Sequence, residues 1–279
     1  MGRMQDLEAQ FRAIGASMSG TWTAALTDLT TGKHIAIDER RPMPPASLAK
    51  VPVLTAVYQA VDDGAVRLDD RIAYQEAHRS LGSGVLSMMS PGVEMSVRDA
   101  AVLMMTISDN SATNMCIDLV GLDAINAKMR ALGLTETQLM LRLGDPRIKM
   151  DARNMSLSSA GDIVRLLTLI ARREAVSPES CDDMLRIMRR CTGRAELSKL
   201  LPWNELNMLD NPHENWVAEK GGAMTNGVRC GGAIFRSTRG FFALAVFCEG
   251  GLPGPSNHES EANVFLGRMG KAAWDALAA

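Results

Sequence analysis

The order of the chain's elements constrains its fold most, because strand patterns lie near both ends and helical patterns fill the middle. Residues 21–29 and 34–37 read as a β-hairpin around a Thr-Thr-Gly-Lys turn. Three more strand patterns, 216–220, 229–236 and 241–249, follow in the last quarter of the chain. An antiparallel sheet built from both termini, with a helical part inserted between them, satisfies this order, so we expect an α+β fold.

Helical patterns account for most of the remaining chain. An amphipathic helix is expected at residues 1–17 and a closing helix at residues 259–277. In the middle, helices are predicted at residues 47–61, 100–107, 112–119, 123–132, 160–172 and 178–191. We therefore predict a discontinuous α/β subdomain of residues 1–43 and 205–279, and an all-helical subdomain of residues 44–204.

Composition excludes several classes of partner. With 279 residues and 46% hydrophobic content, the chain can bury a large core. Its net charge is −2 and its Lys and Arg residues are scattered, so we expect no nucleic-acid or membrane-surface partner. No apolar run approaches the ~20 residues that span a bilayer, and the first 17 residues lack the apolar stretch of a signal peptide. A cytoplasmic location is expected, or a periplasmic or secreted one if a leader was removed.

The cysteines and histidines carry no recognisable site pattern. Five cysteines without paired short spacings argue against a disulfide framework. Four histidines, with no C-x-x-C or H-E-x-x-H motif, argue against a metal site. We expect neither a metal nor another cofactor.

Ser47 and Lys50 form an S-x-x-K motif at the start of a predicted helix. Positions i and i+3 share one helix face, so the lysine can reach the serine hydroxyl. A serine is a poor nucleophile until a base takes its proton, and a lysine serves as that base only if burial or positive charge lowers its pKa. The alternative is a capping serine followed by an ordinary lysine, and only partner residues separate the two interpretations.

Two later segments supply those partners. Residues 108–110 read Ser-Asp-Asn after an apolar helix, and residues 220–222 read Lys-Gly-Gly at the end of a strand pattern. Each segment alone is an ordinary turn. Together with the S-x-x-K motif, in this order, they match the S-x-x-K, S-D-N and K-T-G set of penicillin-recognising serine enzymes.

On these motifs the chain resembles the class A β-lactamase superfamily over nearly its whole length. Residues 82–86, Gly-Ser-Gly-Val-Leu, and residues 108–114, Ser-Asp-Asn-Ser-Ala-Thr-Asn, also resemble characteristic stretches of that family. The resemblance implies a five-stranded antiparallel sheet flanked by helices, plus an all-helical part. This fold agrees with the order of elements described above.

The resemblance also implies catalytic roles for matching residues. These are Ser47 as the acylated nucleophile, Lys50 as its general base, Ser108 as the hydroxyl that carries a proton to the leaving nitrogen, Lys220 as the cation that polarises Ser108, and Asn110 as a substrate-facing amide that steadies Lys50. The substrate is then a small molecule, and a carboxylate on it would be attracted by Lys220.

Further positions around the substrate follow from the same resemblance. The backbone N–H groups of Ser47 and Ala223 would form the oxyanion hole, with Gly222 beside the substrate. Arg229 lies nine residues after Lys220, where some class A enzymes have an arginine that reaches the substrate carboxylate. The alternative for Arg229 is a solvated arginine at a strand edge.

Two departures from the family pattern bear on the reaction. Gly221 stands where the family has Thr or Ser, which removes a hydroxyl that holds the substrate carboxylate and costs about 1–2 kcal/mol of affinity.

The family's E-x-x-L-N segment, whose glutamate activates the deacylating water, is matched by residues 141–154, which contain no Glu. That segment instead resembles related serine hydrolases that carry an R-x-x-D and an Asn, here Arg142, Asp145 and Asn154. Asp145 is the candidate base, and an Asp-Pro turn is the alternative.

These observations predict a serine hydrolase that forms an acyl-enzyme with an amide, lactam or ester, β-lactamase-like but without an assigned deacylation base. A D-alanyl-D-alanine-type carboxypeptidase needs the same three motifs and no glutamate. A covalent β-lactam-binding module that acylates and stalls is the third alternative.

Overall fold

A five-stranded antiparallel sheet forms the centre of the molecule, as predicted. The computed structural model describes residues 2–191, 196–202, 206, 215–224, 227–254 and 259–278. The strands are β1 (Thr21–Asp28), β2 (His34–Ile37), β7 (Trp216–Ala223), β8 (Arg229–Arg236) and β9 (Phe241–Glu249), in the order β2-β1-β9-β8-β7. The two termini therefore build one sheet, with β1 pairing β9 from Thr21↔Glu249 to Asp28↔Phe242.

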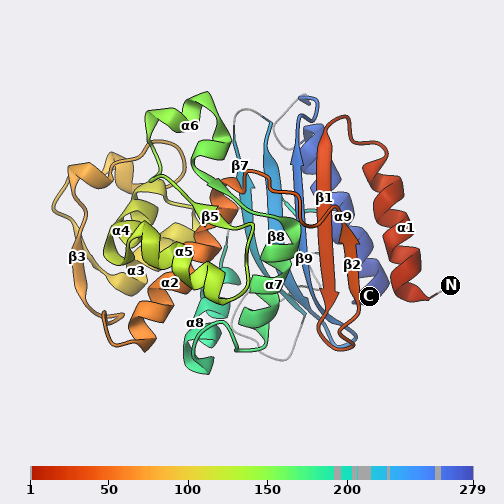
Figure 1. The fold of residues 1–279 in the computed structure, drawn as a ribbon, viewed down its shortest axis with the longest axis horizontal. Coiled ribbons are helices and arrows are strands. Elements are labelled where there is room, and N and C mark those ends of the chain that lie inside the picture. The colour runs from red at the N-terminus through yellow and green to blue at the C-terminus, as the bar shows by residue number, and fades with distance from the viewer. Residues whose placement is uncertain are drawn as a thin grey trace.

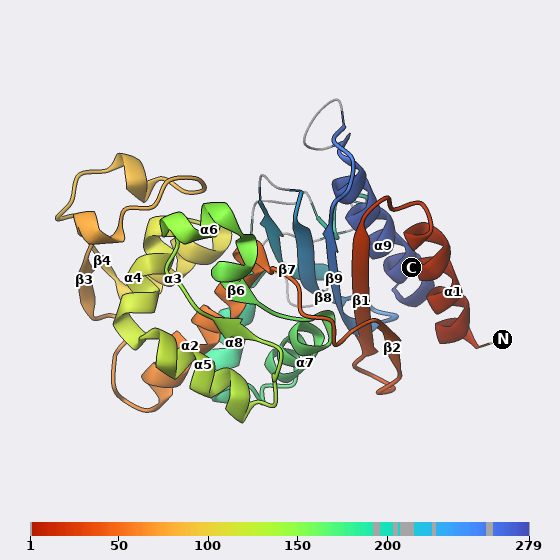
Figure 2. The ribbon, with the colours of Figure 1, turned by 45° about the horizontal axis from the view of Figure 1, so that its top comes forward.

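The sheet is covered on both faces, and the alternation along β9 shows why. Phe242, Leu244 and Val246 pack with α1 (Arg3–Gly15) and α9 (Glu261–Leu277). Ala243 and Phe247 belong to the other core, which is shared with the central helices. Figure 1 and Figure 2 show α1 and α9 on one side of the sheet and the helical part on the other.

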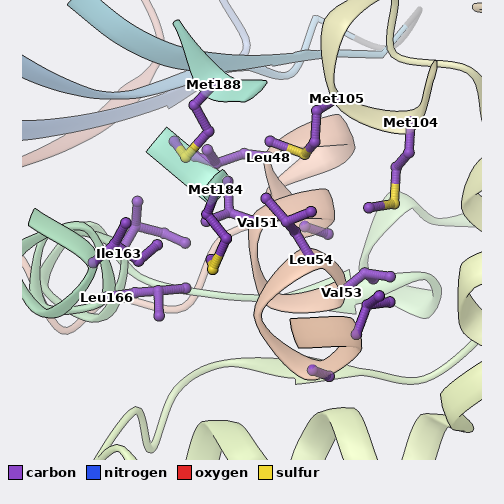
Figure 3. Close-up of a cluster of buried hydrophobic side chains, with 14 of the residues drawn as sticks. Leu48, Val51, Val53, Leu54, Met104, Met105, Ile163, Leu166, Met184 and Met188 are labelled. Atoms are coloured by element: carbon purple, nitrogen blue, oxygen red, sulfur yellow. The ribbon is translucent and has the colours of Figure 1, made fainter. Parts of the chain in front are cut away.

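The helical middle of the chain is organised around α2, the most deeply buried helix. Its helices are α2 (Lys50–Asp62), α3 (Val97–Thr106), α4 (Asn110–Val120), α5 (Leu122–Ala131), α6 (Pro146–Met150), α7 (Ala160–Ala171) and α8 (Pro178–Met188). Val51, Val53 and Leu54 of α2 meet methionines of α3 and α8 in a dry cluster (Figure 3). The flexible thioethers fill irregular gaps there, which accounts for part of the high methionine content.

The predicted long helices are confirmed, with ends that differ by a few residues. Ser96 caps α3 by accepting the N–H of Asp99, as the predicted capping box requires. The short elements were not predicted: β3 (Arg71–Ala73), β4 (Glu94–Ser96), β5 (Gln138–Leu139), β6 (Ser156–Leu157) and α6. Segments this short carry too few residues to show a hydrophobic period.

The helical part is not detached from the sheet. Ile163 and Leu167 of α7 approach Gly232 of β8, so α7 lies against the sheet (Figure 2). The division into residues 1–43 and 205–279 on one side and 44–204 on the other stays a prediction. None of the described helices has the length and hydropathy needed to cross a membrane.

A buried ionic cluster ties three of these helices together. Asp183 of α8 accepts hydrogen bonds from Tyr58 of α2 at 2.5 Å and from Arg98 of α3 at 2.7 and 2.8 Å, and from Arg186 at 2.8 Å. Burial raises the pKa of Asp183, but the hydrogen bonds from Arg98 and Tyr58 outweigh it and hold the pKa below its usual value. The carboxylate is therefore charged at neutral pH.

Removing this carboxylate should destabilise the fold. We expect Asp183→Ala to lower the free energy of unfolding by about 2–3 kcal/mol, because it leaves the buried Tyr58 hydroxyl without its acceptor, whereas the Arg98 side chain is 40% exposed and can bond to water. Asp182→Ala is the matched control, since Asp182 pairs with Arg173 at the surface, and it should cost no more than about 1 kcal/mol. Urea unfolding followed by circular dichroism measures both, and equal losses would contradict the structural role of Asp183.

Candidate active site

Ser47 lies in a tight turn wedged between the helical part and the sheet. It sits in the 3₁₀-helix η1 (Ala46–Ala49), which runs directly into α2. The prediction of an α-helix from residue 47 is wrong here: the i,i+3 proximity is kept, but the first turn is 3₁₀. Ala46 has φ of 45°, an uncommon value for a residue with a Cβ, and such strain clusters at functional sites.

Gly222 of β7 explains how this turn is held. A Cβ at position 222 would lie 2.5 Å from the carbonyl oxygen of Pro45 and 2.9 Å from the backbone nitrogen of Leu48. Only glycine allows β7 to approach the turn this closely. The last glycine of the third motif thus fixes the distance between Ser47 and the edge strand.

Lys50 is buried directly behind Ser47, with 1% of its surface exposed. Its Nζ donates to the Ser108 carbonyl oxygen at 2.6 Å, to Ser108 Oγ at 3.0 Å and to Asn110 Oδ1 at 2.9 Å. These three acceptors match the three N–H groups of an ammonium. The predicted pairing with the Ser47 hydroxyl is not among the hydrogen bonds of the described residues, so that contact stays a prediction.

The environment of Lys50 favours its neutral form. Burial, followed by the positive charge of Lys220, lowers the pKa of Lys50 well below its ordinary value of 10.5, against an opposing contribution from Asp109. At a given pH, a lowered pKa increases the fraction of Lys50 in the neutral form. Only the neutral amine can accept a proton as a general base.

Ser108 lies between the two lysines. Lys220 Nζ is 3.2 Å from Ser108 Oγ and donates to the Gly221 carbonyl oxygen at 2.8 Å, while Lys50 Nζ contacts the same hydroxyl from the other side. Lys220 is 5% exposed. Ser108 has φ of 59°, a second strained position at the site. The hydroxyl is thus hydrogen-bonded to both lysines and can pass a proton between them and a bound molecule.

Asp109 holds the motif in place, a role that sequence reasoning missed. It is fully buried, caps α4 through the N–H of Ala112, and accepts the N–H groups of Val85 and Leu86 at 2.6 and 2.9 Å. A Cβ at Gly84 would lie 2.2 Å from its carboxyl carbon. The sequence did offer a signal for this role, because Asp109 lies between two motif residues at the start of a predicted helix, where an Asp is a favoured cap.

Two pockets meet at Ser47. The larger measures 420 Å³ and has a mostly apolar lining, to which Asn110, Arg229 and residues 80–83 also contribute. The smaller measures 290 Å³ and lies beyond Ser108, where Lys220, Gly221, Glu196 and Glu219 form its wall. Ser47, Ser83 and Ala223 line both pockets, so the predicted oxyanion-hole residues stand where the two halves join.

Arg229 begins β8 and lines the larger pocket. Its Nη1 donates to the carbonyl oxygens of Met224 and Val228 at 2.7 and 2.8 Å. The guanidinium therefore braces the end of the edge strand. Its predicted contact with a substrate carboxylate stays a prediction.

Asp145 lies at the start of α6, and its predicted role as the base of deacylation stays a prediction. It caps α6 and accepts the N–H, Nε and Nη2 groups of Arg147 at 2.8–2.9 Å. The guanidinium of Arg147 lowers the pKa of Asp145 to about 2. Asp145 does not line either pocket at Ser47.

The other two residues of that segment also have structural partners. Arg142 pairs with Asp118 at 3.0 Å and donates to the Ala77 carbonyl oxygen. Asn154 donates to the Arg147 carbonyl oxygen at 2.8 Å. Each of Arg142, Asp145 and Asn154 thus has a hydrogen-bond partner within or beside the 142–154 loop.

No cluster of three metal-binding side chains occurs within the described ranges, and none of the five cysteines forms a disulfide bond. Trp216 of β7 is buried in the core, and Trp203 lies outside the described residues.

Comparison with known proteins places these features in a family. The Beta-lactamase enzyme family matches residues 6–277. A solved β-lactamase from Sphaerobacter thermophilus is similar at 28% identity and TM-score 0.83, covering 98% of this chain and 97% of that one. The structure of PBP-A is similar at 25% identity and TM-score 0.84, covering 98% and 96%. A β-lactamase from Chitinophaga pinensis, at 22% identity and TM-score 0.84 over 97% and 99%, shares the fold.

The electrostatic link between the two lysines can be measured without a substrate. We expect Lys50 to titrate well below 10.5 in ¹³C NMR of labelled lysine side chains, and Lys220→Gln to move that titration to higher pH because it removes a positive charge. Lys220→Arg keeps the charge and should leave the titration close to wild type, as should Lys33→Gln on the surface. A Lys50 pKa near 10.5, or one indifferent to Lys220→Gln, would contradict this electrostatic picture.

Proposed function

The chain belongs to the Beta-lactamase enzyme family, and from that premise we propose that it hydrolyses an ester, an amide or a lactam through an acyl-enzyme on Ser47. The observation that carries the proposal is the Ser108 hydroxyl, held at 3.0 and 3.2 Å between two buried lysines at the side of Ser47. Such an arrangement suits both proton transfers that acylation needs: removal of the proton from the nucleophile and donation of a proton to the leaving group.

In the acylation step, neutral Lys50 takes the proton of the Ser47 hydroxyl as its oxygen bonds to the substrate carbonyl carbon. The carbonyl oxygen becomes an oxyanion, which the N–H groups of Ser47 and Ala223 are placed to stabilise. As the bond to the leaving nitrogen or oxygen breaks, Ser108 gives that atom its proton and is reprotonated from the Lys50 ammonium. One proton thus passes from Ser47 to the leaving group, and Lys50 ends neutral.

Deacylation uses the same base. No carboxylate side chain lines the 420 Å³ pocket among the residues that the structure describes. Lys50 is neutral after acylation, so it can take a proton from water as the water oxygen bonds to the acyl carbon. The Ser47–acyl bond then breaks, Ser47 regains a proton from Lys50, and a carboxylic acid is released.

The 420 Å³ pocket is the proposed acyl site. Leu81, Leu143, Ile148 and Met155 form much of its wall, and Leu81 extends into solvent at its rim. Apolar walls favour an apolar acyl group by about 25 cal/mol per Å² buried. An extended ester or amide acyl group leaves more room for water than a β-lactam, whose ring remnant stays attached and crowds the carbonyl.

We therefore expect Ser47→Ala to reduce hydrolysis of an aryl ester by about 1,000-fold or more, because the covalent route is lost. Ser90→Ala, at an exposed serine in the loop before β4, is the matched control and should keep wild-type activity. The assay follows release of p-nitrophenol and the intact mass of the protein. Ester turnover that survives Ser47→Ala would refute the acyl-enzyme.

The same protein, incubated with a chromogenic cephalosporin and a fluorescent penicillin, separates the alternatives. Cephalosporin turnover supports a lactamase, and a stable mass adduct without turnover supports a covalent β-lactam-binding module. Release of D-alanine from a peptide ending in D-alanyl-D-alanine supports the carboxypeptidase. We expect ester turnover together with a slowly hydrolysed β-lactam adduct.

Asp145 gives a second test of the deacylation route. Asp145→Asn keeps a capping side chain, so steady-state ester hydrolysis should stay within about threefold of wild type. Accumulation of acyl-enzyme in the variant, seen by intact mass together with a tenfold or larger fall in kcat, would instead make Asp145 the base of the second step.

A further inference from the structure

The position of Gly221 is filled by a neighbouring carboxylate. A Cβ built on Gly221 would lie 2.0 Å from the carboxyl carbon of Glu196 and 2.1 Å from its Oε1. The Thr or Ser that the related motif has at this position cannot coexist with Glu196 as it stands. The lost hydroxyl is thus replaced by a negatively charged group.

Glu196 is held against the strand by its own segment. Glu219 of β7 accepts the backbone N–H of Leu197 at 2.7 Å and the hydroxyl of Ser198. Beyond them, a Cβ at Gly270 of α9 would lie 1.9 Å from the carbonyl oxygen of Leu197. These contacts hold residues 196–198 tightly between β7 and α9. The backbone from which the half-buried Glu196 side chain extends is therefore fixed in position.

The carboxylate of Glu196 lines the same 290 Å³ pocket as Ser108 and Lys220. Burial is the main reason why the pKa of Cys230, beside Gly222, is raised, and the negative charge of Glu196 adds a smaller contribution. A substrate carboxylate drawn to Lys220 must therefore share this pocket with a charge of its own sign. Like charges a few ångströms apart disfavour binding even in a partly hydrated pocket.

We propose that Glu196 is a specificity-determining residue: the pocket beyond Ser108 receives leaving groups that are neutral or cationic, and Glu196 discriminates against those that carry a carboxylate. The proposal rests on the acyl-transfer function proposed above, which makes this pocket the leaving-group side. The proposal differs from the expectation drawn from the motif alone, which was a substrate whose carboxylate is attracted by Lys220.

The experiment compares aryl phenylacetates that share one acyl group and differ in the phenol that leaves. The phenols are 3-hydroxybenzoate, 3-hydroxybenzamide and 3-(aminomethyl)phenol, which are anionic, neutral and cationic. Because all three esters give the same acyl-enzyme, differences in kcat/KM report acylation. We expect wild type to use the cationic and neutral esters at least tenfold better than the anionic one, after correction for phenol pKa.

Glu196→Gln keeps the shape of the side chain and removes its charge. It should raise the anionic-to-neutral ratio of kcat/KM about tenfold, whereas Glu94→Gln, at an exposed position in β4, should leave the ratio at its wild-type value. A ratio that Glu196→Gln leaves within twofold of wild type would overturn the proposal. So would wild-type preference for the anionic ester.

Binding of the free phenols tests the same pocket without turnover. Glu196→Gln should tighten 3-hydroxybenzoate about tenfold relative to 3-hydroxybenzamide in an NMR titration, and an unchanged ratio of dissociation constants overturns the charge assignment. If none of the esters is hydrolysed while this shift is observed, the hydrolase function fails and the role of Glu196 stands.

Discussion

The rest of the site depends on one buried amine, that of Lys50, and on the polar groups that surround it. A lysine side chain with 1% exposure is costly to bury unless its N–H groups have oxygen acceptors. Those acceptors come from Ser108 and Asn110, so the S-D-N loop must pack against the first turn of α2. The glycine at position 222 then brings the edge strand, with Lys220, close to the same turn. The contacts that position Lys50, Ser108 and Lys220 are therefore the same contacts that pack the helical part against the sheet.

The two pockets on either side of Ser47 differ in chemistry, and this difference gives the site a direction. One pocket is wide and largely apolar, with no carboxylate among the described residues that line it. The other is smaller and carries Lys220, Glu196 and Glu219. In the proposed reaction, the acyl group occupies the first pocket and the leaving group the second. Ser108 lines the second pocket, where that reaction needs a proton when the bond breaks.

Local sequence pattern was sufficient to predict the fold, and it named Lys50, Ser108, Asn110 and Lys220, which the structure brings together, but it did not show interactions made across long sequence separations. The hairpin near the N-terminus and the strands near the C-terminus alternate strongly enough to be recognised, and their pairing follows from layer packing. Glu196 carries no local signal, because its position is defined by contact with Gly221 on another element. Asp145 shows a different case: its place in the segment suggested either a base or an Asp-Pro turn. The structure shows it as the N-cap of α6, bonded to Arg147, and the role as a base stays a prediction.

The central claim is that acyl groups are carried by Ser47. Acid quenching of the protein during turnover of an aryl ester, followed by trypsin digestion and mass spectrometry, tests it most directly. Residues 41–50 form one tryptic peptide, Arg-Pro-Met-Pro-Pro-Ala-Ser-Leu-Ala-Lys, in which Ser47 has the only hydroxyl. We predict the acyl mass on that peptide and its loss on further incubation. An acyl group on a different peptide, or turnover without any trapped acyl group under conditions where deacylation limits the rate, would contradict the account.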